Sequence, residues 1–166
     1  MSGEVSLRPA RPDDEPFLYR MLALAASMDE SDESVGAARI DPMLAPYVAG
    51  FGRVGDLGLI AERDGAPIGA AWLRLQHGEP STSKLWSPEI PELAIATVSS
   101  ARGRGVGEAL LRALIEHARG RYPAIVLSVR ETNPAAQLYL RCGFVVERRL
   151  VNRVGTTSLA MRLTLG

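Results

Sequence analysis

The sequence predicts an α/β fold, a mixed sheet of seven strands with helices packed against its faces. Two observations carry this prediction. Short apolar runs of strand length alternate with segments in which apolar side chains recur at helical spacing. The resulting order is strand, two helices, three strands, helix, strand, helix and two strands, which is typical of a sheet covered by helices.

The size and composition fit one globular domain, which we expect over residues 1–166. Of the 166 residues, 46% are hydrophobic and 23% are charged, which is enough apolar surface for a proper core. The formal net charge is zero. Because no overall field then favours an anionic polymer or surface, we expect no nucleic-acid partner and no membrane partner. We also expect no metal.

The location we expect is the cytoplasm. Cys142 is the single cysteine, so no internal disulfide can form. The chain shows no leading apolar segment of the signal type and no apolar run of membrane-spanning length.

The first third of the chain predicts one strand and two helices. Residues 5–9 alternate apolar and polar side chains, as a strand does. Pro12 and the acids after it suit a first helical turn, and apolar residues continue that helix to about Met28. The acidic segment 29–33 is interpreted as a solvated loop, and the alternative is a lip that attracts a cationic amine. A weaker helix is expected over about 42–50.

The remainder predicts six strands and two further helices. Asp64-Gly65 is typical of a hairpin turn between the first two of these strands. Apolar residues at helical spacing follow Gly105, and residues 77–90 are expected to form a loop. The expected strands are 57–63, 68–75, 92–98, 124–130, 144–150 and 157–165.

The turn over 102–107, Arg-Gly-Arg-Gly-Val-Gly, predicts a phosphate cradle. It joins an apolar strand to an amphipathic helix, and its glycines leave the first N–H groups of that helix unobstructed at the positive end of the dipole. Two arginines add positive charge. The sequence does not fit a Walker loop, because Lys84 is the only lysine, nor a Rossmann fingerprint, because residue 108 is Glu.

A second motif covers 133–144, Asn-Pro-Ala-Ala-Gln-Leu-Tyr-Leu-Arg-Cys-Gly-Phe, and predicts a short helix. Asn133 can cap its N-terminus, Pro134 suits the first helical position, and Gly143 lies just past its end. The interval between the two motifs leaves room for one helix and one strand.

Together the two motifs resemble the signatures of the GNAT family of N-acetyltransferases. Arg102, Gly105 and Gly107 match the family's Arg-x-x-Gly-x-Gly loop for the pyrophosphate of acetyl-CoA. Residues 133–144 match its Asn-x-x-Ala-x-x-Leu-Tyr-x-x-x-Gly-Phe pattern. The resemblance implies a mostly antiparallel sheet, splayed between the strands 92–98 and 124–130, with the acyl-pantetheine arm in the gap.

The resemblance also implies which residues bind acetyl-CoA. The loop would hold the pyrophosphate through its N–H groups, and residues 95–97 would pair with the pantetheine through their main chain. Asn133 is expected to cap its helix, and whether it also reaches the ligand is left open. The implied cofactor-binding residues are Ile95, Ala96, Thr97, Arg102, Gly103, Arg104, Gly105, Val106, Gly107, Asn133, Ala136 and Tyr139.

Tyr139 is expected to act as the catalytic acid. It resembles the family's tyrosine whose hydroxyl lies near the thioester sulfur, and a phenol can protonate the departing CoA thiolate. The alternative is a helix residue with a buried ring and a solvated hydroxyl.

Glu92 is expected to act as the catalytic base, which an ammonium acceptor requires. It opens the central strand, and burial makes a carboxylate a better proton acceptor. In some family members the catalytic glutamate matches Pro91, so Glu92 would face the other side of the strand unless a bulge intervenes. The alternative is a solvated charge at the strand end. Glu79 and Glu89 are weaker substitutes.

Six other side chains are expected to be of structural or solvated type. His77 lies in a loop that could border the acceptor pocket, His117 is expected in solvent, and Cys142 is expected to fill space in the core. The arginines 148, 149 and 153 are interpreted as a solvated face, with an acidic acceptor or a partner subunit as the alternative.

These inferences predict an enzyme that moves an acetyl group from acetyl-CoA to a primary amine by direct attack, with both substrates bound together. The acceptor is a small molecule or a peptide and is otherwise open, and a homodimer is one arrangement left open. A non-catalytic acyl-CoA sensor is the alternative, because it needs the cradle but no base. A nucleotide-binding protein of another fold is a second alternative.

Overall fold

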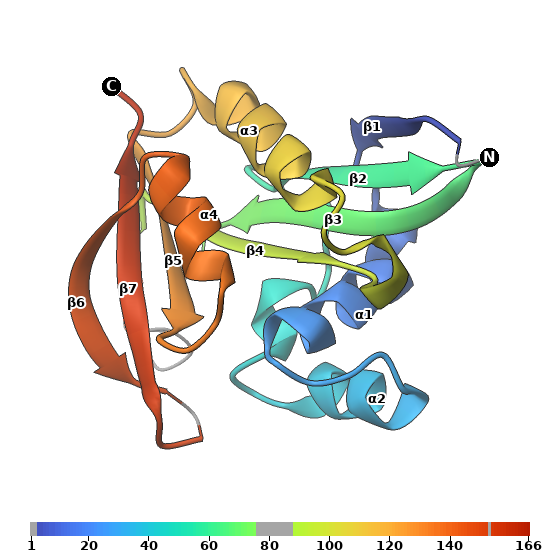
Figure 1. The fold of residues 1–166 in the computed structure, drawn as a ribbon, viewed down its shortest axis with the longest axis horizontal. Coiled ribbons are helices and arrows are strands. Elements are labelled where there is room, and N and C mark those ends of the chain that lie inside the picture. The colour runs from blue at the N-terminus through green and yellow to red at the C-terminus, as the bar shows by residue number, and fades with distance from the viewer. Residues whose placement is uncertain (1–2, 76–87, 153) are drawn as a thin grey trace.

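The computed structural model describes residues 3–75, 88–152 and 154–166 (Figure 1). Within these ranges the chain forms one sheet in the order β1-β2-β3-β4-β5-β7-β6. The strands are β1 (Val5–Pro9), β2 (Leu57–Arg63), β3 (Ala66–Arg74), β4 (Glu92–Thr97), β5 (Ala124–Arg130), β6 (Val145–Val151) and β7 (Thr157–Thr164). The α-helices are α1 (Glu15–Ala25), α2 (Asp32–Ile40), α3 (Val106–Ala118) and α4 (Ala135–Arg141). None of these helices is both long and apolar enough to cross a bilayer.

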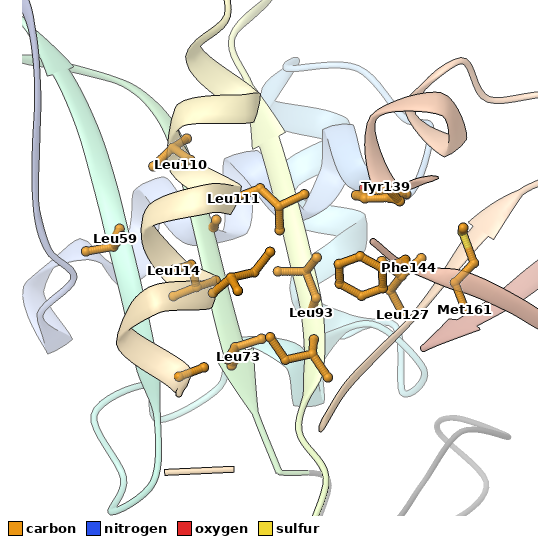
Figure 2. Packing of buried hydrophobic residues seen from close by; sticks show 14 of the residues in the cluster. Leu59, Leu73, Leu93, Leu110, Leu111, Leu114, Leu127, Tyr139, Phe144 and Met161 are labelled. Atoms are coloured by element: carbon orange, nitrogen blue, oxygen red, sulfur yellow. The ribbon is translucent and has the colours of Figure 1, made fainter. Parts of the chain in front are cut away.

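The helices bury two separate cores, one against each face of the sheet. On one face α3 and α4 cover a cluster that includes Leu93, Leu111, Leu127 and Phe144 (Figure 2). On the other face α1 packs against β3 and β4, and the cluster there includes the fully buried Trp72. Alternate residues of β4 therefore belong to different cores, as the two-residue period of a strand requires.

The sheet opens between β4 and β5. These two strands are parallel and share the single register pair Glu92–Val126, close to the hydrogen bond that the Val126 N–H donates to the Pro91 carbonyl at 3.1 Å. The other neighbouring pairs, β1–β2, β2–β3, β3–β4, β5–β7 and β6–β7, are antiparallel and paired along their length. The predicted mixed, mostly antiparallel and splayed sheet is confirmed.

Most predicted elements have the expected type and position. The strands over 5–9, 57–63 and 124–130 have the expected bounds, and the remaining strands differ from prediction by two residues or fewer at each end. Asp64 and Gly65 both have positive φ, 54° and 78°, as a two-residue hairpin turn requires. The Asn133 side chain bonds the start of α4, because its Oδ1 accepts the Ala135 N–H at 2.9 Å, and the helix begins one residue later than predicted, with Pro134 at the N-cap position.

The second helix was placed wrongly. The segment over 42–50 forms only a short 3-10 turn at Ala45–Tyr47, where Pro46 supplies no N–H for a longer helix. The helix lies instead at Asp32–Ile40, so Asp32 and Glu33 of the segment interpreted as a loop form its first turn, while Asp29 and Glu30 precede it. Ser31 caps it by accepting the Ser34 N–H at 3.1 Å, and acids favour a helix N-terminus.

The first helix is also shorter than expected. It ends at Ala25 rather than near Met28. Ser27 has φ of 65°, and the Met28 N–H bonds back to the Ala23 carbonyl at 2.8 Å. This is the left-handed turn with which helices commonly stop, here made by serine in place of glycine.

Candidate functional site

A cavity of about 1040 Å³ occupies the opening between β4 and β5. One wall is the whole of β4, and the opposite wall is the second half of β5 with the start of α4. The glycine-rich loop closes one end. Leu22, Met28, Leu44 and Tyr47 line the side of the cavity that faces α1, and Leu150 and Asn152 of the last hairpin also reach it.

The glycine-rich loop has the geometry of an anion site. Gly103 and Gly105 have φ of 76° and 78°, and a Cβ built at either would meet no atom within 4 Å, so the loop surface is bare. Gly105 is the N-cap of α3, where no side chain accepts a hydrogen bond. The N–H groups of the first turn therefore remain available to a ligand, at the positive end of the helix dipole. The donors of this loop fit a diphosphate.

The free edge of β4 lies beside this loop. Beyond Glu92, no register pair joins β4 to β5. Ile95, Ala96 and Thr97 are half-buried and line the cavity. An extended ligand with amide groups, such as pantetheine, can pair with such an edge as an added strand would.

Tyr139 joins the core under α3 and α4 to the cavity. Its side chain is 7% exposed, and its ring meets Phe144 edge-on at a centroid distance of 5.9 Å (Figure 2). It also lines the cavity. Burial raises the pKa of the Tyr139 phenol above its ordinary value near 10, so the hydroxyl is protonated at neutral pH. A protonated phenol at this place is a proton donor.

Glu92 lies at the narrow end of the opening. It is 4% exposed and lines the cavity, so the alternative of a solvated strand-end charge is wrong. Its neighbour Ala94, two residues along and therefore on the same face, packs in the core under α1. The Tyr47 hydroxyl donates a hydrogen bond to its Oε2. The carboxylate thus faces the α1 side of the cavity.

A buried ion pair fixes the segment that carries Tyr47. Arg74 and Asp56 are 1% and 4% exposed and bond through two parallel contacts of 3.0 and 2.8 Å. Arg74 Nη1 also donates to the carbonyls of Pro46 and Ala49, at 3.1 and 2.6 Å. Trp72 Nε1 donates to the Tyr47 carbonyl at 2.8 Å. Donors from β3 therefore hold the backbone on both sides of Tyr47.

The same pair sets the charge on Asp56. Burial alone raises the pKa of this carboxyl, but the hydrogen bonds from Arg74 and from the Gly52 N–H outweigh it. The net pKa lies below its usual range, so Asp56 is ionised at neutral pH and balances the buried guanidinium.

The structure brings most of the predicted site residues together, though not all. Those that line the cavity are Glu92, Ile95, Ala96, Thr97, Arg102, Gly103, Gly105, Gly107, Asn133 and Tyr139. Val106 and Ala136 pack in the core, and Arg104 is exposed outside the cavity lining. The role of each residue in binding or catalysis stays a prediction.

The residues given weaker roles lie away from this cavity. Glu89 and His117 are exposed and do not line it, nor does any acid of the segment 29–33. Cys142 is half-buried against the core, as expected. Arg149 is exposed and pairs with Glu131. His77, Glu79 and Arg153 lie outside the described residues.

Tyr47 and Arg130 are among the polar residues of the cavity that sequence reasoning missed. Tyr47 follows Pro46 in a segment expected to be a plain helix, and its bond to Glu92 spans 45 positions. Arg130 ends an expected strand, and the alternation of β5 was the only signal that it faces the opening.

The chain matches the family described as "Acetyltransferase (GNAT) family" over residues 16–144. Mycothiol acetyltransferase from Cellulomonas flavigena is 32% identical over 89 residues, which cover 52% of this chain and 26% of that protein. Glucosamine 6-phosphate N-acetyltransferase 1 from Oryza sativa subsp. japonica is 47% identical over 49 residues, which cover 28% of each. The matches thus span about a quarter of the length of these relatives.

Solved structures share the fold over nearly the whole chain. A ribosomal-protein-alanine N-acetyltransferase from Brucella melitensis has a TM-score of 0.71 at 24% identity and covers 96% of this chain and 99% of its own. A Salmonella typhimurium protein assigned as an acetyltransferase was solved with acetyl-CoA as its cofactor. It has a TM-score of 0.70 at 19% identity, and the match covers 99% of this chain and 95% of that protein. At sequence identities of 24% and 19%, this structural similarity establishes the fold alone.

We predict that Asp56→Ala lowers the free energy of unfolding by about 3–5 kcal/mol, because it leaves a buried guanidinium without its counter-charge. Since the folded pKa of Asp56 is depressed, the pair stabilises the wild type fully above the ordinary pKa of aspartate and less as the pH falls below it. Urea unfolding followed by circular dichroism at pH 7 and at pH 3, which lies below the ordinary pKa of aspartate, measures both effects.

Glu116→Ala is the matched control, because it removes an exposed ion pair with Arg119 and should leave the urea midpoint unchanged. A loss below about 1 kcal/mol in Asp56→Ala would contradict the role given to the buried pair.

Proposed function

The chain belongs to the acetyltransferase (GNAT) family, and on this premise we propose that it transfers an acetyl group from acetyl-CoA to a primary amine. The transfer is direct, with both substrates bound in the cavity between β4 and β5. One N-acetyltransferase domain over residues 1–166 performs it.

The observation that carries this proposal is one continuous cavity with three kinds of chemistry along it. An uncapped helix start that fits a diphosphate lies at one end. The free edge of β4 follows, and a protonated phenol and a buried carboxylate line the same space. These groups match the successive parts of acetyl-CoA and its reaction with an amine.

The chain's own residues supply the steps around the thioester. The diphosphate binds to the N–H groups of Gly103 to Gly107, and the pantetheine amides pair with Ile95 to Thr97. Glu92 takes the proton from the amine, whose nitrogen forms the new bond to the acetyl carbon as the carbon–sulfur bond breaks. The Tyr139 hydroxyl donates its proton to the departing thiolate. Solvent then restores both protonation states.

Tyr47 orients the base in this scheme. Its hydroxyl bonds one oxygen of the Glu92 carboxylate. Because Arg74 and Trp72 hold the backbone around Tyr47, that contact has little freedom. A fixed carboxylate is a better proton acceptor than one that must be ordered during each turnover.

The names of the relatives are compatible with a small acceptor. The two curated relatives are named for mycothiol and for glucosamine 6-phosphate. The cavity, at about 1040 Å³, can hold the reactive arm of acetyl-CoA beside a molecule of that order of size. A small-molecule amine is therefore the acceptor class that we favour over a protein.

We predict that Gly105→Ala weakens the binding of coenzyme A by at least tenfold in calorimetric titration. At φ of 78° an alanine strains the loop, and its methyl group would stand over the bare N–H surface. Gly120→Ala carries a similar strain, at φ of 82°, outside the cavity, and should bind coenzyme A as the wild type does. Equal affinities of the wild type and both variants for coenzyme A would refute the assignment of this loop as the phosphate-binding site.

We predict that Tyr139→Phe and Glu92→Gln each lower kcat about 100-fold in an assay of thiol release with acetyl-CoA and a panel of amines. Since the phenol pKa lies above 10, the wild-type rate should not decline between pH 8 and pH 10 through loss of this proton. Tyr122→Phe and Glu89→Gln, which change residues off the cavity, should keep the wild-type kcat.

Two outcomes of this assay would decide against the proposal. Full activity in Tyr139→Phe and Glu92→Gln would remove both residues from the mechanism. Tight binding of coenzyme A with no thiol release from any amine would favour a non-catalytic acyl-CoA sensor instead.

A further inference from the structure

We propose that the cavity contains an anion-binding subsite centred on Arg130, so that the acceptor is an amine that also carries a carboxylate or a phosphate group. The claim that the acceptor carries an amine rests on the proposed function. The claim that it carries an anion rests on the residues around Arg130 alone.

Arg130 projects to the acceptor side of the sheet. It is the last residue of β5, in which Leu127 and Val129 pack into the core beneath α3 and α4. The alternate residues Ser128 and Arg130 therefore face the α1 side. In agreement, Arg130 Nη2 lies 3.4 Å from the carbonyl of Ala26, at the end of α1. The glycine-rich loop opens α3, which covers the other face, so Arg130 does not belong to that loop.

The guanidinium of Arg130 lacks a counter-charge in the described part of the chain. It is half-buried, and the one long hydrogen bond to Ala26 leaves most of its five donors unused. The other buried arginine of this region, Arg74, bonds Asp56 and two carbonyls. Besides Glu92, the cavity wall formed by the described residues contains one other acid. This is Glu108, which already pairs with other arginines. A partly buried cation of this kind gains strongly from an anionic ligand.

Two hydroxyl groups stand beside this cation. Ser158 of β7 is directly opposite Arg130 in the strand register, and it lines the cavity although its side chain is almost fully buried. Its Oγ accepts Asn152 Nδ2 at 3.0 Å, while its own proton meets no acceptor among the described residues. Ser128, on the same face of β5, is exposed to the cavity. A guanidinium with two hydroxyl donors is a suitable set for carboxylate or phosphate oxygens.

The subsite and the proposed base are separated along the opening between β4 and β5. Glu92 is in register with Val126, four residues before Arg130, which places the two positions about 13 Å apart along the strand. The side chains lining the α1 side between them include Leu22, Met28 and Leu44. The acceptor that fits is therefore extended, with its amine at Glu92, an apolar middle and its anion at Arg130.

The test compares amines that differ only in the anion. Three series of equal chain length serve as acceptors: n-alkylamines, ω-amino carboxylates and ω-aminoalkyl phosphates. For the wild type we expect kcat/KM to be higher for one of the two anionic series than for the alkylamines, and the better anionic series identifies the anion. In Arg130→Gln we expect that series to lose 10- to 100-fold in kcat/KM, with the alkylamines and the KM for acetyl-CoA unchanged. Arg121→Gln, an exposed arginine off the cavity, controls for net charge.

Several results would overturn the subsite. A wild type without preference for anionic amines would do so, as would an equal loss for all three series in Arg130→Gln. A raised KM for acetyl-CoA in that variant would assign Arg130 to the co-substrate.

Calorimetry separates this inference from the proposed function. If no amine releases thiol, the proposed function fails, while the binding of ω-amino carboxylates and ω-aminoalkyl phosphates still reports on Arg130. Binding to the wild type that is lost in Arg130→Gln supports the subsite in that case, and no binding to the wild type refutes it.

Discussion

The absence of pairing between β4 and β5 is the feature on which the site depends. Parallel strands normally bond along their whole length, yet here a single register pair at Glu92–Val126 joins two halves of the sheet. The pair acts as the apex of an opening that widens toward the glycine-rich loop. Backbone groups that would otherwise bond each other then become available to a ligand, and unpaired groups buried without one would be costly.

The two halves of the sheet can diverge because each has its own core. The cluster under α3 and α4 extends from β2 across the opening to β7, with Leu93 on one side and Leu127 on the other (Figure 2). The cluster under α1 belongs to the first half alone. One face of the opening is therefore sealed by side chains and the other remains accessible. The sealed face carries the tyrosine that we propose as acid, and the accessible face carries Glu92.

The sequence predicted those parts of the site that depend on local chemistry. Glycines at a strand-to-helix turn, the Asn133 cap and the alternation of β5 are determined by neighbours in the chain, so their patterns could be recognised. The missed features depend on contacts between distant segments. Arg74 and Asp56, Tyr47 and Glu92, and Arg130 and Ser158 are brought together by strand register and by the segment between α2 and β2. The error in placing α2 has a different origin, because its signals, the Ser31 cap and the acids after it, are local and were given less weight than a weak apolar pattern farther along the chain.

The central claim is that this opening receives coenzyme A, and a crystal structure of the complex tests it most directly. The account predicts the diphosphate on the N–H groups of residues 103–107 and the pantetheine arm alongside residues 95–97, with its sulfur near Tyr139. Coenzyme A bound anywhere else on the protein, with this opening empty in the same crystal, would contradict it.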